Sequence, residues 1–193
     1  MNKEKRSYIR IYDRILLRHQ RLSPEEFEQR VQEYQEGKDQ PWIDPIRPPG
    51  EVRKLESLLK KLRERDRDLA GIMELLHQKM DRILIHLLGP ECLKGFREVE
   101  ANLSAGGIRI PLNEEVKEGE IFELDLGLLP EWSFMRTYGE VVRVEEGRTG
   151  EKEVAFRFIW ITEGDQDRLV QHIFRQQVLQ LQASRRIKRL KTD

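Results

Sequence analysis

The sequence predicts an α+β fold: a six-stranded antiparallel β-barrel with an inserted long coiled-coil helix and a C-terminal helix. Three observations predict it, namely a period-two segment near the N-terminus, a heptad repeat over residues 52–87, and short apolar strands over residues 94–161. A chain of 193 residues is long enough to bury such a core. We assign the barrel and C-terminal helix to residues 1–20 and 92–193, and a helical insertion to residues 21–91.

The first element is a strand over residues 6–18, where apolar and polar side chains alternate. Ile11, Ile15 and Leu17 fall on one face, and a row of arginine and tyrosine residues falls on the other. Asp13 is an exception on the apolar face. The pattern predicts a half-buried strand with a basic and aromatic outer face.

A short helix follows the strand. Ser23 is a good N-cap, Pro24 suits the first turn, and Glu26 completes a capping box with Ser23. The helix is expected to run to about residue 37. The next segment, residues 40–50, contains four prolines and is expected to be irregular.

Apolar residues then recur at alternating spacings of three and four, which predicts one coiled-coil helix that ends at Gly89-Pro90. The core positions assigned to oligomerisation are Leu55, Leu59, Leu62, Asp66, Leu69, Met73, Leu76, Met80 and Ile83. Apolar residues at flanking positions widen this row beyond a two-stranded seam, so we expect a homo-oligomer of four strands. Asp66 is expected to fix the register at a cost in stability. The alternative is that the helix folds back on the short helix and the barrel as ordinary core.

The remaining strands are short, rich in β-branched and aromatic residues, and separated by turn signals. They are expected at Lys94–Ala101, Gly107–Leu112, Glu120–Leu126, Ser133–Glu145 and Glu151–Ile161. Their even spacing favours a small closed barrel. The last helix begins near Asp165, and its apolar stripe, which includes Leu169 and Ile173, is expected to pack on that barrel.

Two short motifs carry the chemistry. In Arg6-Ser7-Tyr8-Ile9-Arg10, the two arginines project from one face of the strand, about 13 Å apart at 3.3 Å per residue. A guanidinium can fork onto a phosphate or onto the O6 and N7 edge of guanine. The alternative is a solvated strand face, which Arg14 and Arg18 continue.

The second motif is the turn Asn102-Leu103-Ser104-Ala105-Gly106-Gly107. Asn102 and Ser104 offer an amide and a hydroxyl on one face, while the glycines permit positive φ and a close approach of a ligand. Such a turn can hold a base edge or a phosphate. A turn that only closes a hairpin is the alternative.

Arg-x3-Arg followed by Asn-x-Ser-x-x-Gly resembles the signature of PilZ domains, bacterial receptors for cyclic di-GMP built on six-stranded barrels. Residues 165–177 are similar to the C-terminal helix of that family. The resemblance implies that the arginines hold guanines and phosphates and that the polar turn holds the other side of the ligand. The ligand-binding residues it implies are Lys5, Arg6, Arg10, Asn102, Ser104, Gly106 and Gly107.

About ninety residues separate the two motifs, whereas ordinary members have a few tens. This insertion resembles an atypical tetrameric branch of the family in which helices inserted after the first strand assemble the subunits. Some relatives in that branch lack the ligand residues, and this chain retains them. The resemblance implies a homotetrameric cyclic di-GMP receptor that relays the second messenger to an effector protein. The alternative is a tetrameric scaffold without nucleotide, acting through protein contacts in pilus or motility control.

Composition narrows the remaining function classes. Thirty-five basic and 35 acidic residues give no net charge, which disfavours a nucleic-acid polymer as partner, although an oligonucleotide-binding barrel remains a competitor. No cluster of metal ligands, nucleophile with a base, or phosphate loop is evident, so we expect neither an enzyme nor a cofactor. The lone Cys92 and the lack of a signal peptide or membrane span predict a cytoplasmic protein.

Overall fold

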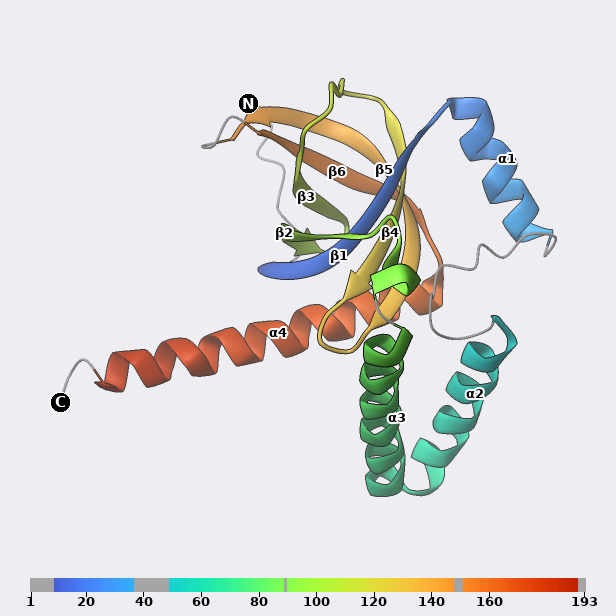
Figure 1. The fold of residues 1–193 in the computed structure, drawn as a ribbon, viewed down its shortest axis with the longest axis vertical. Coiled ribbons are helices and arrows are strands. Elements are labelled where there is room, and N and C mark those ends of the chain that lie inside the picture. The colour runs from blue at the N-terminus through green and yellow to red at the C-terminus, as the bar shows by residue number, and fades with distance from the viewer. Residues whose placement is uncertain (1–8, 37–48, 89, 148–150, 191–193) are drawn as a thin grey trace.

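The structure, a computed structural model, describes residues 9–36, 49–88, 90–147 and 151–190. Six antiparallel strands form a closed barrel in the order β1-β2-β3-β6-β5-β4 (Figure 1). The strands are β1 (Arg10–Leu22), β2 (Arg97–Ser104), β3 (Gly107–Leu112), β4 (Ile121–Leu128), β5 (Ser133–Glu146) and β6 (Lys152–Ile161). The predicted fold class, a six-stranded antiparallel barrel with helices, is confirmed.

The strand β1 closes the barrel because it pairs with β2 along one edge and with β4 along the other. Its inward residues follow the predicted alternation, with Ile11, Ile15 and Leu17 all at most 2% exposed. They join side chains of the other five strands in one core. The division of the chain at residues 20–21 and 91–92 into barrel and insertion remains a prediction.

The helix α1 (Pro24–Gln35) begins with the predicted capping box, in which Ser23 and Glu26 bond reciprocally. It lies against the outside of the barrel through aromatic contacts. The Phe27 and Tyr138 rings are 5.4 Å apart between centroids, and those of Tyr34 and Trp160 are 4.8 Å apart. These edge-on contacts fix α1 over β5 and β6.

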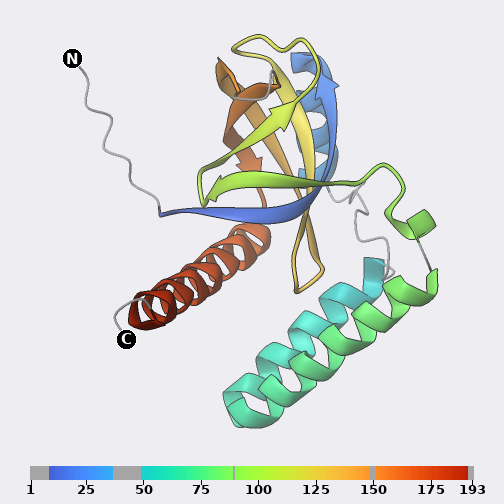
Figure 2. The same cartoon turned by 60° about the vertical axis from the view of Figure 1, so that its left-hand side comes forward.

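The insertion is a hairpin of two helices, α2 (Pro49–Arg65) and α3 (Arg67–Leu88), rather than the single continuous helix predicted (Figure 2). The break falls at Asp66, which was expected to occupy a coiled-coil core. Asp66 is exposed instead, and its carboxylate accepts a hydrogen bond from the backbone N–H of Leu69 at 2.9 Å. It therefore caps the N-terminus of α3. A short 3-10 helix, η1 (Pro90–Leu93), then leads to β2.

The heptad row of α3 does not face α2. Ala70 and Asp81 are 1% exposed on the side that packs on α2, where Leu55, Leu59 and Leu62 are half-buried. The remaining row, which we call the α3 seam, is 44% to 59% exposed and consists of Leu69, Met73, Leu76, Met80 and Ile83. At about 100° per residue, this seam lies about 120° around α3 from the α2-facing side. Because these side chains are exposed, the barrel does not cover the row, and the alternative in which it does is wrong.

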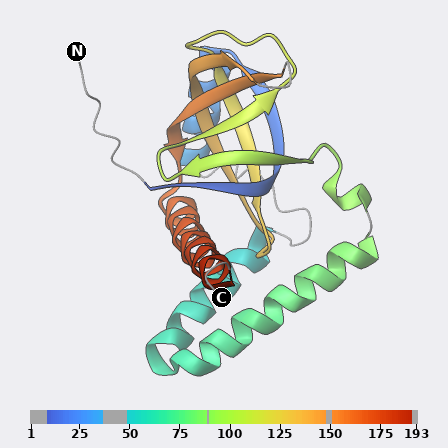
Figure 3. The same ribbon diagram turned by 90° about the vertical axis from the view of Figure 1, so that its left-hand side faces the viewer.

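The last helix, α4 (Glu163–Leu190), packs beneath the barrel and continues past it (Figure 3). Leu169 and Ile173 are 0% and 3% exposed, as the predicted apolar stripe requires. Within the part of the chain that the structure describes, no helix combines the length and apolar character needed to span a membrane.

A buried histidine attaches α4 to the barrel. His172, 4% exposed, lies with Nε2 at 2.6 Å from Asp13 on β1 and Nδ1 at 3.1 Å from Glu131 in the β4–β5 turn. Burial opposes the imidazolium, but the two carboxylate hydrogen bonds outweigh it and raise the pKa of His172. Burial likewise opposes ionisation of Glu131, yet hydrogen bonds from His172 and Arg175 lower its pKa to about 2. Asp13, the polar exception in the β1 pattern, is thus a partner of α4.

We expect replacement of Asp66 by Ala to lower the free energy of unfolding of the helical insertion by about 1 kcal/mol, because α3 loses its N-cap. Asp66→Asn should retain most of the stability, since Asn caps nearly as well. Urea unfolding followed by circular dichroism measures both. A more stable Asp66→Ala protein would restore the interpretation of Asp66 as a buried polar break.

We expect His172→Gln to lower the free energy of unfolding by about 2 kcal/mol near pH 6, because it removes charge-assisted hydrogen bonds from buried carboxylates. A raised pKa means that the folded chain holds the proton more tightly than the unfolded chain, whose pKa is near 6.5. The contribution is therefore complete below pH 6.5 and is lost as the pH rises above it.

The part that depends on Glu131 is present above pH 4.5 and is lost as the pH falls towards 2, because the pKa of this carboxyl is lowered on folding. Urea unfolding at several pH values should therefore show the largest difference between wild type and His172→Gln between pH 4.5 and 6.5. His86→Gln, at an exposed position of α3, is the control. A difference that does not vary with pH would contradict this role of His172.

Candidate functional site

Arg10, the last residue of the first predicted motif, meets the second motif on the outside of the barrel. β1 and β2 pair so that Arg10 lies opposite Ser104 and Tyr12 lies opposite Asn102. Directly opposed residues of an antiparallel pair share a face and are about 5 Å apart. Barrel closure thus brings segments that are about ninety residues apart in sequence into direct contact.

Pairing extends these rows across β3 and β6. Ser104 lies opposite Gly107, which lies opposite Arg157, while Asn102 lies opposite Arg109. The alternate residues of these strands, such as Leu103 and Ile108, are buried in the core, so both rows face outward. We call this surface the outer face; its residues are Arg10, Tyr12, Asn102, Ser104, Gly107, Arg109 and Arg157. It is about 14 Å wide across four strands.

The cations of the outer face differ in how they are paired. Arg10 is exposed, and no hydrogen bond or ion pair joins it to another residue that the structure describes. Arg109 donates to the Tyr12 hydroxyl at 3.2 Å and lies 3.6 Å from Glu153, and Arg157 pairs with Glu140. Among these three guanidinium groups, Arg10 is therefore the one most available to an anion.

A hydrogen bond within the polar turn stabilises its conformation. The Ser104 hydroxyl donates to the Gly107 carbonyl at 3.1 Å, which leaves its oxygen as an acceptor only. Ser104 is 5% exposed, whereas Asn102 is half-exposed on the same face. In this arrangement the pair offers an amide and a hydroxyl oxygen to a ligand donor.

The glycines of the turn serve close packing rather than the positive φ that the sequence suggested. Of the described glycines, Gly95 and Gly119 have positive φ, and Gly106 and Gly107 do not. A Cβ at Gly107 would lie 2.3 Å from the Phe156 carbonyl oxygen of β6. The Gly106 carbonyl accepts from the Phe158 N–H at 3.0 Å. Gly107 is thus required for β3 to approach β6.

Two predicted ligand residues, Lys5 and Arg6, lie outside the described residues. The binding role of the remaining five stays a prediction, although the structure gathers Arg10, Asn102 and Ser104 on one face.

Sequence reasoning missed Tyr12 and Arg109. Tyr12 is 69% exposed beside Arg10, and an exposed aromatic ring on a strand is a surface on which a base can stack. The period-two pattern placed Tyr12 outward, but its contact with Arg109 depends on strand register.

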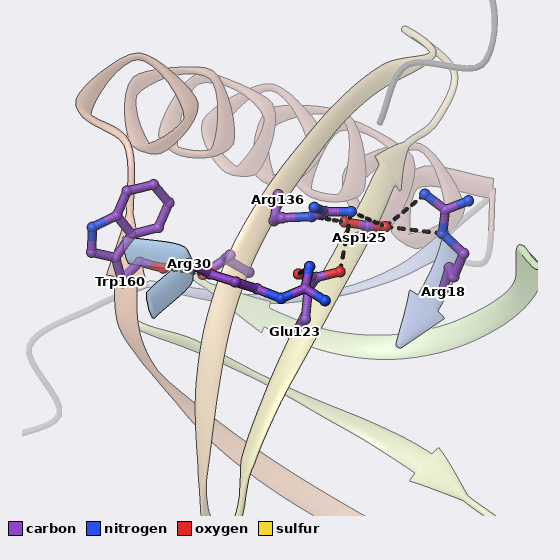
Figure 4. Close-up of polar contacts among 7 residues, drawn as sticks. Arg18, Arg30, Glu123, Asp125, Arg136 and Trp160 are labelled. Carbon is purple, nitrogen blue, oxygen red and sulfur yellow. Dashed lines mark hydrogen bonds and ion pairs between the residues drawn. The ribbon is translucent and has the colours of Figure 1, made fainter. Parts of the chain in front are cut away.

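A second polar region lies over β4 and β5, opposite β2 and β3 in the closed order (Figure 4). Asp125 accepts hydrogen bonds from Arg18 and Arg136, and Glu123 pairs with Arg30 of α1 at 2.8 Å and with Arg136 at 3.1 Å. These side chains, with His19 and Gln20, line a hollow of about 440 Å³.

Charge balance suits this region to a structural role. Burial raises the pKa of Glu123 despite the nearby Arg136, and burial together with Glu123 raises the pKa of Tyr138 to about 12. Both carboxylates are engaged by guanidinium groups, so neither is available to bind a cation. The network links α1, β1, β4 and β5.

Nowhere in the described ranges do three or more His, Cys, Asp or Glu residues gather as a metal site would require.

Solved structures of other proteins resemble this chain to different degrees. A pathogenic protein from Xanthomonas campestris, described as a tetrameric PilZ domain self-assembled through an unusual helical bundle, is 18% identical, with 91% of each chain covered and a TM-score of 0.53. The inhibitor of motility MotI/DgrA of Bacillus subtilis is 15% identical with a TM-score of 0.48; the match covers 91% of this chain and 52% of that one. This chain therefore spans about half the length of the Bacillus protein.

YcgR of Escherichia coli, solved in complex with c-di-GMP, is 20% identical over 51% of this chain and 41% of its own, with a TM-score of 0.35. No curated protein sequence matches this chain significantly. The PilZ domain family model matches residues 82–175, which run from the end of α3 through β2–β6 into α4. With the closed six-stranded barrel, this match shows that residues 82–175 of the chain belong to the PilZ domain family.

Proposed function

We propose that this chain is a receptor for cyclic di-GMP without catalytic activity, and that the dinucleotide binds on the outer face. The observation that carries the proposal is the pairing of Arg10 with Ser104, which makes the last residue of the first motif a neighbour of the second motif. The membership of residues 82–175 in the PilZ family supports it, since that family contains cyclic di-GMP receptors. The lone cysteine fits action in the reducing cytoplasm.

The chemistry of the outer face suits each part of such a ligand. Arg10 offers a guanidinium to a phosphate, which has only acceptor oxygens. Asn102 and Ser104 present acceptors to the amino group of guanine. Tyr12 supplies an exposed ring for stacking, and its hydroxyl is already held by Arg109. Lys5 and Arg6, which precede β1, would add cations from the N-terminal side.

Binding on β1 would reach α4 directly. The Tyr12 carbonyl accepts a hydrogen bond from Gln180 at 2.7 Å, and Asp13 holds His172. A ligand that shifts the start of β1 would therefore change the position of α4, which projects from the barrel (Figure 1). We propose α4 as the element through which an effector protein senses the ligand.

We also propose that the chain forms a homo-oligomer, with the α3 seam as its interface. Five apolar side chains at 44% to 59% exposure form a continuous row on a helix whose other side already packs on α2. A row of this kind is stable in water only when another apolar surface covers it. A second copy supplies an identical row, and a four-helix arrangement of two hairpins follows naturally.

The receptor proposal is tested by calorimetric titration of cyclic di-GMP into wild type and Arg10→Ala. Loss of one charge-assisted contact should weaken binding by about 1.5–3 kcal/mol, or about 10- to 150-fold. Arg14→Ala is the matched control, because Arg14 is an outward arginine of the same strand that pairs with Glu98 at 3.2 Å. Equal losses in both variants would remove Arg10 from the site. Absence of binding to wild type would favour the scaffold that acts through protein contacts.

The assembly proposal is tested by light scattering after size exclusion. Leu76→Glu places a charge in the α3 seam and should reduce the mass of the particle at least twofold. Leu75→Glu is the control, since Leu75 is 60% exposed on α3 but lies outside the seam. A particle of unchanged mass in Leu76→Glu would rule out the α3 seam as the interface.

A further inference from the structure

The helix α4 has a second apolar surface that the barrel does not use. Leu169, His172 and Ile173 are at most 4% exposed against the barrel, and Gln176 and Gln180 donate to the carbonyls of Leu129 and Tyr12. On the opposite side, Phe174, Val178 and Leu181 are 53%, 51% and 53% exposed. We call these three residues the α4 stripe.

The spacing of the α4 stripe makes it continuous. Its members are four and three residues apart, so at about 100° per residue they fall within a sector about 60° wide. His172 and Gln176 lie about 160° from Phe174 by the same count. The stripe therefore points away from the barrel along a helix of 28 residues. Such a surface is suited to another helix.

We propose that the α4 stripe packs against the same stripe of a second copy, with the two helices antiparallel. This inference rests on the proposed homo-oligomer and adds a contact to it. The centre of the stripe lies near Gln177 and Val178, and the centre of α4 lies near Gln176 and Gln177. A two-fold axis through the stripe therefore aligns each end of one helix with the opposite end of its partner.

Charge complementarity selects that orientation. The N-terminal turns of α4 carry the exposed carboxylates of Glu163 and Asp167, whereas residues 185–189 read Arg-Arg-Ile-Lys-Arg. An antiparallel pair brings the acidic end of each helix to the basic end of the other, and it also opposes the two helix dipoles favourably. A parallel pair would place basic runs side by side, and like charges at close range are unfavourable.

Two different self-complementary contacts on one chain generate a closed tetramer. The α2–α3 hairpin and the free part of α4 leave the barrel in different directions (Figure 1), so one copy can engage two partners at once. A pair of isologous contacts whose two-fold axes intersect at right angles gives a tetramer of D2 symmetry. Three side chains are few for a dimer held by α4 alone. The α4 contact therefore gains strength from the high local concentration that the α3 seam provides.

The test compares masses by native mass spectrometry and light scattering at several protein concentrations. Wild type should be a tetramer, and Val178→Glu should be a dimer that retains the wild-type circular dichroism. Leu179→Glu should remain a tetramer, because Leu179 is 50% exposed on α4 but lies outside the stripe. Combining Val178→Glu with Leu76→Glu should give a monomer.

A charge exchange separates a lost contact from a misfolded helix. Val178 lies beside the proposed two-fold axis, so a mixture of Val178→Glu and Val178→Lys should restore the tetramer that neither variant forms alone. A Val178→Glu protein with the mass of wild type would overturn the α4 contact. If Leu76→Glu still dissociates in that case, the α3 seam stands and only the α4 stripe is rejected. A monomeric wild type would reject both contacts and would leave the ligand titration unaffected.

Discussion

The pairing of β1 along both of its edges is the constraint on which the rest of the structure depends. Its backbone bonds to β2 on one side and to β4 on the other, which converts an open sheet into a barrel. The same strand presents Arg10 to Ser104 outside the barrel and Asp13 to His172 beneath it. The strand β1 thus closes the core, forms part of the candidate ligand surface and contacts α4.

Charge is distributed unevenly over the barrel although the chain has no net charge. Over β4 and β5, Glu123 and Asp125 form ion pairs with three guanidinium groups, those of Arg18, Arg30 and Arg136. Across the outer face, Arg10 has no such acceptor among the described residues. The hollow beside Asp125 is therefore a neutralised junction that holds α1, whereas the outer face keeps an unpaired cation, Arg10, among the described residues.

Much of the fold was predictable because its signals are local. The capping box at Ser23, the strand alternation and the stop at Gly89-Pro90 each depend on neighbours in sequence. The helix break at Asp66 was missed because the heptad spacing passes through it without a change of phase, and an N-cap and a core polar residue look alike in such a pattern. Asp81 lies outside the heptad row and is nevertheless 1% exposed, because a heptad row does not reveal which side of a helix its partner covers.

The candidate site could be predicted only in part, because some of its contacts depend on strand register and not on neighbours in sequence. Arg10, Asn102 and Ser104 stand in recognisable motifs, whereas Arg109 reaches Tyr12 through a register set by two strand pairings. The partner of Asp13 is 159 residues away, so its place on the apolar face could not be explained before the fold was known.

The insertion leaves the barrel from the end of β1 and returns at the start of β2, and these two strands are neighbours, with Leu17 paired to Arg97. For the barrel, the whole hairpin is one loop between adjacent strands. The entropy of closing a loop grows only logarithmically, by about 0.6 kcal/mol for each doubling of its length. Evolution can therefore lengthen, shorten or exchange this segment at almost no thermodynamic cost to the barrel that carries it.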